Sequence, residues 1–197
     1  MTLPSFVQAG ESKPAPMPLL LVQAFVNTWD RDDGHDVLLE PDDAQQWLRQ
    51  AGLIPGDEIL DPDDLRLARG VRESIRALLT SNGGGPAAGA GELRPLGVLA
   101  GMGHLQVSVG PDGLVDLDPA AVERGPGSRL AGPLLRLLLI IRDAQADGNW
   151  PRLKSCRNPE CRWAFYDRSH SRRGAWCDMA TCGNRIKNRS LRQRQKT

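Results

Sequence analysis

The sequence has no long hydrophobic run and no recognisable targeting signal. The apolar stretch Leu19–Val26 is too short to cross a bilayer, because a membrane helix needs about 20 consecutive apolar residues. The residues before it contain Lys13 and several prolines, where a secretory signal would have a basic start and a cleavage site. We therefore expect a cytoplasmic protein that does not bind membranes.

Catalytic groups are also scarce. The 197 residues include three histidines, and no acidic pair or histidine cluster is suited to holding a catalytic magnesium ion. The glycine-rich stretch over residues 81–91 has no Lys-Ser or Lys-Thr after it, so we interpret it as a flexible loop and not a phosphate-binding loop. A small nuclease with His170 or His104 as its base is the enzymatic alternative. It lacks the metal-binding groups, and we expect no enzymatic activity.

The net charge of the whole chain is close to zero, but the N-terminal and C-terminal parts of the chain carry opposite net charges. The formal net charge is +1, yet residues 151–197 contain thirteen Lys and Arg and only three acidic residues. Residues 1–150 contain twelve basic and twenty-one acidic residues. This asymmetry predicts a basic C-terminal end that faces a nucleic acid and an acidic remainder that avoids the same polyanion. A solvated basic tail is the alternative.

Cysteine is rare too, and all four cysteines lie close together. They form two pairs, Cys156 with Cys161 and Cys177 with Cys182; four residues separate the members of each pair, and fifteen separate the pairs. A structural zinc ion takes four tetrahedral ligands, and closely spaced cysteines can direct two thiolates at one point. We therefore predict one structural Zn²⁺ on these four cysteines. The alternatives are two disulfides, which need an oxidising compartment, and a site in which His170 replaces one thiolate.

Arginines surround these cysteines in the sequence. We expect Arg157, Arg162 and Arg185 to stabilise the negative charge of the thiolates. A helix after Cys182 would have little apolar surface to bury, so it is marginal alone and a phosphate backbone would complete it. A frayed basic tail is the alternative. If the helix continues to the end of the chain, its cationic stripe consists of Arg185, Arg189, Arg192 and Lys196.

The remaining pattern predicts an α+β fold. We expect a disordered arm (residues 1–18), a mainly helical regulatory domain with a small β-hairpin (19–150), and a four-cysteine zinc finger that ends in a basic helix (151–197). The clearest helix begins with Asp61 as N-cap and Pro62 at its first position. Other expected helices cover residues 19–29, 93–102 and 130–146, and one more begins near Glu40 and ends at a cap on Gly52. Expected strands cover 104–109 and 114–117 around a turn at 110–113.

Two features within this regulatory domain allow more than one interpretation. Four arginines on the helix that starts at Pro62 suggest a solvated face, with an anion site as the alternative; they are Arg66, Arg69, Arg72 and Arg76. Asn27 and Thr28 could cap their helix or reach a ligand.

The cysteine-rich segment resembles the CGNR zinc finger family. The resemblance rests on the Cys-x4-Cys pair, the run Phe165-Tyr166-Asp167-Arg168-Ser169, Trp176-Cys177, and above all Cys182-Gly183-Asn184-Arg185 followed by Lys187. Residues 19–147 resemble ABATE, the domain named for a stress-induced transcription regulator that usually precedes this finger in bacteria. That resemblance rests on residues 26–28, on Trp47-Leu48 and on the order of the elements. The chain departs from the family at Gly174 and Ala175, where basic residues are usual.

The resemblance implies a bacterial DNA-binding regulator whose N-terminal domain senses a signal or a small-molecule effector. The alternative is an RNA-binding or protein-interaction zinc module, since charge alone does not distinguish DNA from RNA. Asn184 and Arg185 have a structural alternative, in which Asn184 caps a turn and Arg185 faces the thiolates. In a homodimer, the helix over 130–146 is one candidate surface, with burial in its own core as the alternative. The predicted nucleic-acid contacts are Arg168, Arg172, Arg173, Asn184, Arg185, Lys187, Arg189 and Arg192.

Overall fold

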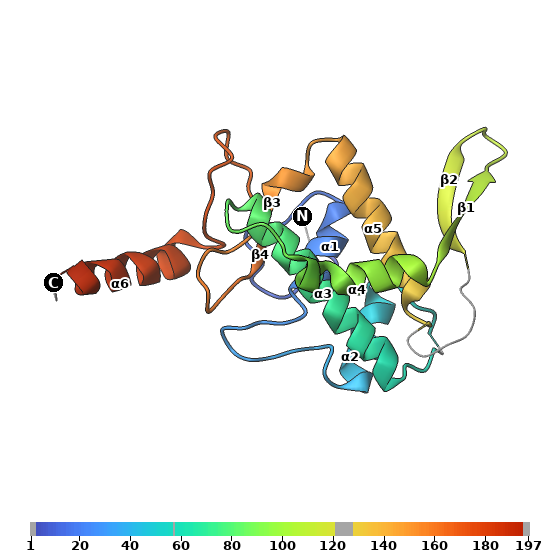
Figure 1. The fold of residues 1–197 in the computed structure, drawn as a ribbon, viewed down its shortest axis with the longest axis horizontal. Helices are drawn as coiled ribbons and strands as arrows, with labels where there is room; N and C mark the ends of the chain where they lie inside the picture. Colours follow the sequence, from blue (N-terminus) through green and yellow to red (C-terminus); the bar gives the residue numbers. More distant parts are fainter. Residues whose placement is uncertain (1–2, 57, 121–127, 195–197) are drawn as a thin grey trace.

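The computed structural model describes residues 3–56, 58–120 and 128–194, except for the side chains of residue 120 and residues 190–194. Its centre is helix α1 (Leu19–Val26), in which every residue is buried. Helices α3 (Pro62–Asn82) and α5 (Ala131–Ala146) pack against α1, and α2 (Pro41–Gln50) and α4 (Ala90–Gly101) pack against α3 (Figure 1). Seven of the eight α1 residues are apolar, as expected of a helix at such a central position.

Helix α3 begins as the sequence predicts. The Asp61 carboxylate accepts hydrogen bonds from the backbone N–H groups of Asp63 and Asp64, at 2.9 and 2.8 Å. The Asp64 carboxylate accepts from the Asp61 N–H at 3.0 Å, which completes a capping box with Pro62 at the first helical position. These bonds satisfy N–H groups that have no partner within the helix, so the start of the longest helix is fixed locally.

The predicted hairpin consists of β1 (His104–Val109) and β2 (Val115–Ala120), paired antiparallel. It projects from the helical body at the end opposite α6 (Figure 1). All six β1 residues are exposed. Helix α5, in contrast, buries Leu134 and Leu137 completely in the core, so burial in its own core accounts for its apolar character. Among the described residues, no helix combines the length and apolar character that a membrane crossing requires.

The prediction of a disordered arm is wrong for residues 3–18. Phe6 and Ala15 are buried in the core, and the Trp47 indole N–H donates to the Phe6 carbonyl at 2.9 Å. The Tyr166 N–H donates to the Lys13 carbonyl at 2.9 Å. The arm is therefore packed between the helical body and the C-terminal segment. The sequence does not predict this packing, because the prolines of the arm interrupt the apolar periodicity from which a buried segment is predicted.

The C-terminal segment shares the core of the helical body. After the 3-10 turn η1 (Trp150–Arg152), the short strands β3 (Leu153–Ser155) and β4 (Ala164–Tyr166) pair antiparallel and contact α3 and α1. Leu153, Ala164 and Tyr166 belong to the same buried cluster as α1 and α5. The chain continues through a π-helical turn η2 (Met179–Gly183) into α6 (Asn184–Arg194), which extends away from the body (Figure 1). The α+β fold is confirmed.

Candidate metal centre and nucleic-acid interface

The four cysteines come together as a tetrahedral metal site requires. Their Sγ atoms all lie within 4.8 Å of one another, with Cys161 to Cys177 at 3.6 Å and Cys177 to Cys182 at 3.7 Å. Four sulfurs at about 2.3 Å from one zinc ion would stand about 3.8 Å apart, whereas disulfide sulfurs stand about 2.0 Å apart. All four are free thiols. The geometry fits one metal ion and excludes the two-disulfide alternative.

The first cysteine pair lies in a turn between β3 and β4. Buried Asn158 accepts backbone hydrogen bonds at its carbonyl from Cys161 and Arg162, at 3.1 and 3.0 Å, and Arg162 has a positive φ of 52°. The Cys156 N–H donates to the Trp163 carbonyl at 2.9 Å and closes the turn. The Asn158 side-chain amide also faces the Cys182 sulfur at 3.7 Å. The sequence interpretation missed Asn158, whose place between two cysteines was the available signal.

The second pair is positioned by the turn that leads into α6. The Asp178 carboxylate accepts from the Thr181 N–H at 2.7 Å and starts η2, in which Cys182 is buried. A Cβ added at Gly183 would lie 2.5 Å from the Met179 sulfur and 3.2 Å from the Trp176 ring. A side chain at residue 183 would therefore require the flexible Met179 side chain to move away.

The environment of the thiols favours the ionisation of one cysteine and opposes the ionisation of its neighbours. Hydrogen bonds from the Cys161 and Cys177 thiols and from backbone N–H groups lower the pKa of Cys156 to about 2. The bond to Cys156 in turn raises the pKa of Cys161, and bonds to Cys156 and Cys161 raise that of Cys177. A divalent cation removes this opposition, because metal-bound cysteine is deprotonated. His170 is exposed and is not part of this cluster.

Comparison with known families gives two matches. Residues 152–195 match the CGNR zinc finger, and residues 20–146 match the family described as "Putative stress-induced transcription regulator" (ABATE), which covers more than half of the chain. The chain belongs to the ABATE family. A search of curated proteins gives no match. With the CGNR match and the sulfur geometry together, Cys156, Cys161, Cys177 and Cys182 are the ligand set of one structural zinc ion.

Two arginines expected beside the thiolates instead attach the CGNR finger to α3 of the ABATE domain. The Arg157 guanidinium donates to the Gly83 carbonyl at the end of α3, through Nε at 2.9 Å. Arg162 Nη2 donates to the Thr80 hydroxyl at 3.2 Å. Their hydrogen bonds therefore go to α3 and not to the cysteine sulfurs, and the carbonyl at the C-terminus of α3 attracts Arg157 because such carbonyls have no partner within the helix.

Three buried polar side chains of the ABATE domain complete this attachment. Asn27 clamps the β4 backbone, since its Oδ1 accepts from the Ala164 N–H at 2.7 Å and its Nδ2 donates to the Ala164 carbonyl at 2.9 Å. Gln23 donates to the same carbonyl at 3.2 Å. Arg76 donates to the carbonyls of Val26 at 2.7 Å and Arg162 at 2.9 Å. The Asn27 side chain therefore holds the finger, while its backbone N–H ends α1 by donating to the Gln23 carbonyl at 3.0 Å.

The loop between the cysteine pairs is shaped by a buried ion pair. Lys154 Nζ lies 2.8 Å from the Asp167 carboxylate, with both side chains at most 5% exposed. Asp167 also accepts from the N–H groups of Ser169 and Gly174 at 3.0 and 2.7 Å. Burial opposes its ionisation, but Lys154 and the Ser169 hydroxyl and N–H lower its pKa. A Cβ at Gly174 would lie 2.7 Å from this carboxylate, which explains why the chain has glycine there.

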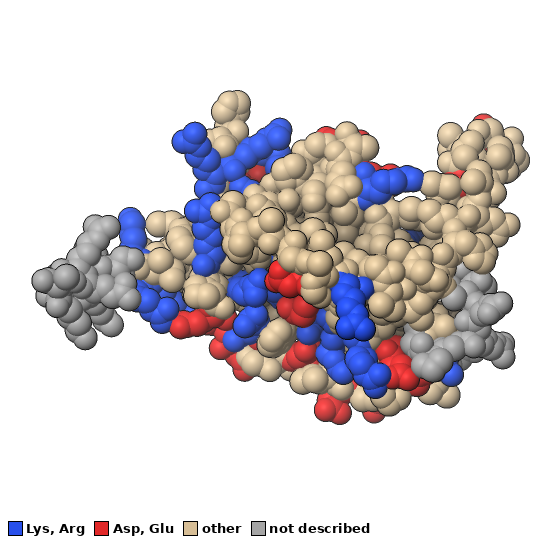
Figure 2. Space-filling model, viewed as in Figure 1, with Lys and Arg blue, Asp and Glu red and all other residues tan. Residues whose placement is uncertain are grey.

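The predicted nucleic-acid residues fall into two groups. Arg172, Arg173 and Lys187 are exposed, and their side chains have no hydrogen-bond or ion-pair partner among the residues that the structure describes. Figure 2 shows Lys and Arg over the protruding loop and near the base of α6. The other group has partners within the chain, and the Arg192 side chain lies outside the described residues.

The partners of the second group are specific. Arg185 lies 2.8 Å from both oxygens of Asp32, and this carboxylate, followed by the nearby Cys182 and Cys161, raises its pKa. Arg189 forms an ion pair with Glu160 at 2.7 Å. Two further residues bind backbone carbonyls: Arg168 donates to Pro14 at 2.7 Å and Asn184 to Ala180 at 3.0 Å. Asn184 thus has the structural role given as its alternative.

Proposed function

We propose that this protein is a transcription regulator that binds duplex DNA through the phosphate backbone, and that it is not an enzyme. The observation that carries the proposal is a set of exposed cations on the finger that have no side-chain partner among the described residues: Arg172, Arg173 and Lys187. They lie on the loop and on α6, which both project at the end of the molecule opposite the β1–β2 hairpin (Figure 1). Lys and Arg side chains on such projections supply most of the affinity for DNA.

The loop offers its cations in a fixed arrangement. The Lys154 ammonium donates to the Arg172 carbonyl as well as to Asp167, and Arg172 has a positive φ of 52°. The backbone of the loop is thereby tied to a buried charge pair, while the side chains of Arg172 and Arg173 are exposed. Fixing the backbone in advance reduces the conformational entropy that is lost when the side chains meet phosphate.

Removing both loop cations is expected to flatten the salt dependence of DNA binding. For the double variant Arg172→Ala with Arg173→Ala, the slope of log K against log salt should fall by about 1.8, because each lost phosphate contact removes about 0.9. Fluorescence anisotropy with a random-sequence duplex at several salt concentrations measures this slope. The matched control is Arg49→Ala with Arg136→Ala, which removes two exposed cations from α2 and α5. An equal slope in both double variants would contradict the proposal.

Competition separates DNA from the alternative partners. Excess duplex DNA should displace the labelled duplex more effectively than structured RNA does. Stronger displacement by RNA would support the RNA-binding alternative, and salt-insensitive or absent binding to both nucleic acids would support the protein-interaction alternative. The last two outcomes would each overturn the proposed function.

The Asp32 carboxylate is expected to compete with phosphate for Arg185. Asp32→Ala should tighten DNA binding by about 1.4- to five-fold, because an exposed ion pair of this kind is weak. The salt slope should rise by up to about 0.9 if Arg185 then contacts a phosphate. Asp33→Ala is the control, since Asp33 is adjacent and equally charged but caps only the His35 N–H. The same change in both variants would show a general charge effect and no competition at Arg185.

A further inference from the structure

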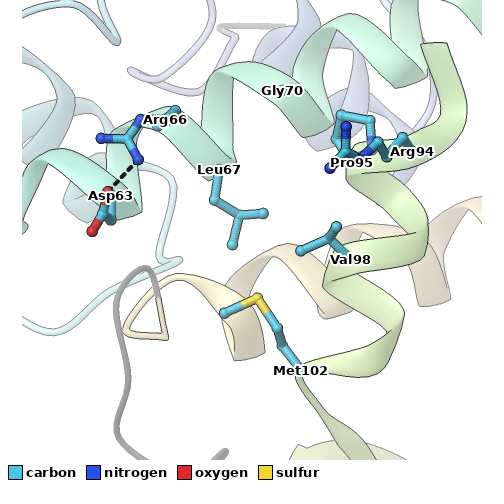
Figure 3. A pocket seen from close by; sticks show the side chains of 8 residues that line it. All are labelled: Asp63, Arg66, Leu67, Gly70, Arg94, Pro95, Val98 and Met102. Atoms are coloured by element: carbon cyan, nitrogen blue, oxygen red, sulfur yellow. Dashed lines mark ion pairs between the residues drawn. The ribbon is translucent and has the colours of Figure 1, made fainter. Parts of the chain in front are cut away.

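A hollow of about 520 Å³ lies between α3 and α4, away from the finger. The two helices cross near Gly70 and Pro95, and the hollow occupies the angle between them (Figure 3). A Cβ at residue 70 would lie 3.2 Å from the Pro95 ring, so the glycine allows this close crossing. The volume is within the range of about 300 to 1,000 Å³ that small-molecule sites occupy.

The inner surface of the hollow is apolar. The side chains of Leu67, Val98 and Met102 point toward one another from the two helices (Figure 3). Val98 is 49% exposed, and Met102 and Leu67 are half-buried. Apolar side chains that face each other across an open hollow lose contact with water when a ligand enters, and methionine adapts its shape to different ligands.

Two arginines stand at the edges of this apolar surface. Arg66 forms an ion pair with Asp63, so its charge is largely compensated. Arg94 is exposed and forms no hydrogen bond or ion pair within the part of the chain that the structure describes. Arg66, Asp63 and Arg94 together leave one positive charge. A guanidinium offers parallel N–H donors that match the two oxygens of a carboxylate.

We propose that this hollow binds a small organic monocarboxylate, with the carboxylate on Arg94 and an apolar body over Leu67, Val98 and Met102. The single net charge matches a monoanion, and the apolar surface favours an organic anion over an inorganic one, which would gain nothing from it. The site lies on α3, the helix whose Arg76 also holds the finger. The inference does not depend on DNA binding, because it concerns the ABATE domain alone.

The test uses the zinc-loaded full chain and octanoate as the probe. The chain has four methionines, so ¹³C-methyl labelling gives few resonances, and Met102→Leu assigns the one in the hollow. Octanoate should shift the Met102 resonance saturably, while the exposed Met17 and Met179 stay unchanged. Octanamide lacks the charge and acetate lacks the apolar body. Each should bind at least about tenfold more weakly than octanoate.

Arg94→Gln should weaken octanoate binding by a similar factor, and Arg49→Gln, an exposed arginine on α2, should not change it. Arg94 is exposed and makes no contact on which folding depends, and the octanamide comparison tests the charge in the unaltered chain. Three outcomes would overturn the inference: no saturable shift of Met102, equal binding of octanoate and octanamide, or unchanged octanoate affinity in Arg94→Gln.

Discussion

Replacing Cys182 by serine is expected to remove zinc and to lower the melting temperature of the whole chain by about 10 to 20 °C. Structural zinc contributes about 10 to 16 kcal/mol in small finger peptides, and a loss of about 5 kcal/mol in a chain of this length corresponds to that shift. The effect should not stay within the finger, since Leu153, Ala164 and Tyr166 are part of the core that α1 and α5 form. The whole chain should therefore unfold in a single thermal transition, at a lower temperature than the unaltered chain.

Zinc content measured by mass spectrometry and melting followed by circular dichroism test this prediction. Ala180→Ser is the matched control, because it adds the same hydroxyl to the same turn at an exposed position. The control should keep one zinc ion per chain and its melting temperature. If Cys182→Ser also kept both, Cys182 would not be a ligand. A chelator should reproduce the Cys182→Ser result in the unaltered chain.

The features that the sequence predicts well are set by local chemistry. The spacing of Cys156, Cys161, Cys177 and Cys182 is sufficient for the zinc site, because a metal ion requires particular ligands and tolerates many backbones. The start of α3 follows from Asp61 and Pro62, which act within one helical turn. The hairpin also forms where its turn residues indicate, with Gly113 at a φ of 81°. None of these features requires knowledge of distant contacts.

The features that the sequence does not reveal are long-range polar contacts. Arg72 and Arg76 are at most 2% exposed, although their position on α3 suggested a solvated face. Arg72 reaches Asp36 on a distant loop, with Nη2 2.8 Å from the carboxylate, and Asn27 reaches a residue 137 positions away. Charged residues are rarely buried, so a single sequence favours the exposed interpretation. The finger partners of Asn27 and Arg76 become apparent only when the finger lies on the helical body.

Arg76→Met is expected to destabilise the protein by about 2 to 5 kcal/mol, which lowers the melting temperature by about 5 to 15 °C. The Arg76 side chain is fully buried, and burial lowers its pKa to about 10, so it remains charged at neutral pH. Methionine fills much of the space but removes the Arg76 donors from the carbonyls of Val26 and Arg162. The Arg162 carbonyl keeps its hydrogen bond from the Ser155 hydroxyl at 3.1 Å, so the larger loss falls on the Val26 carbonyl. A buried carbonyl without a partner costs about 1 to 3 kcal/mol.

Thermal melting of the zinc-saturated protein measures this loss, and Arg66→Met is the matched control. Arg66 is on the same helix, but its side chain is 72% exposed, so the control should stay within about 0.5 kcal/mol of the unaltered chain. Because Arg162 directly follows Cys161, Arg76→Met should also speed hydrogen exchange of the Cys161 and Arg162 N–H groups, which bond to Asn158. Equal melting temperatures in the two variants would mean that desolvation of the guanidinium cancels its hydrogen bonds. A lower melting temperature without faster hydrogen exchange would mean that Arg76 acts at Val26 alone. A lower melting temperature together with faster exchange would mean that Arg76 couples the helical body to the zinc site.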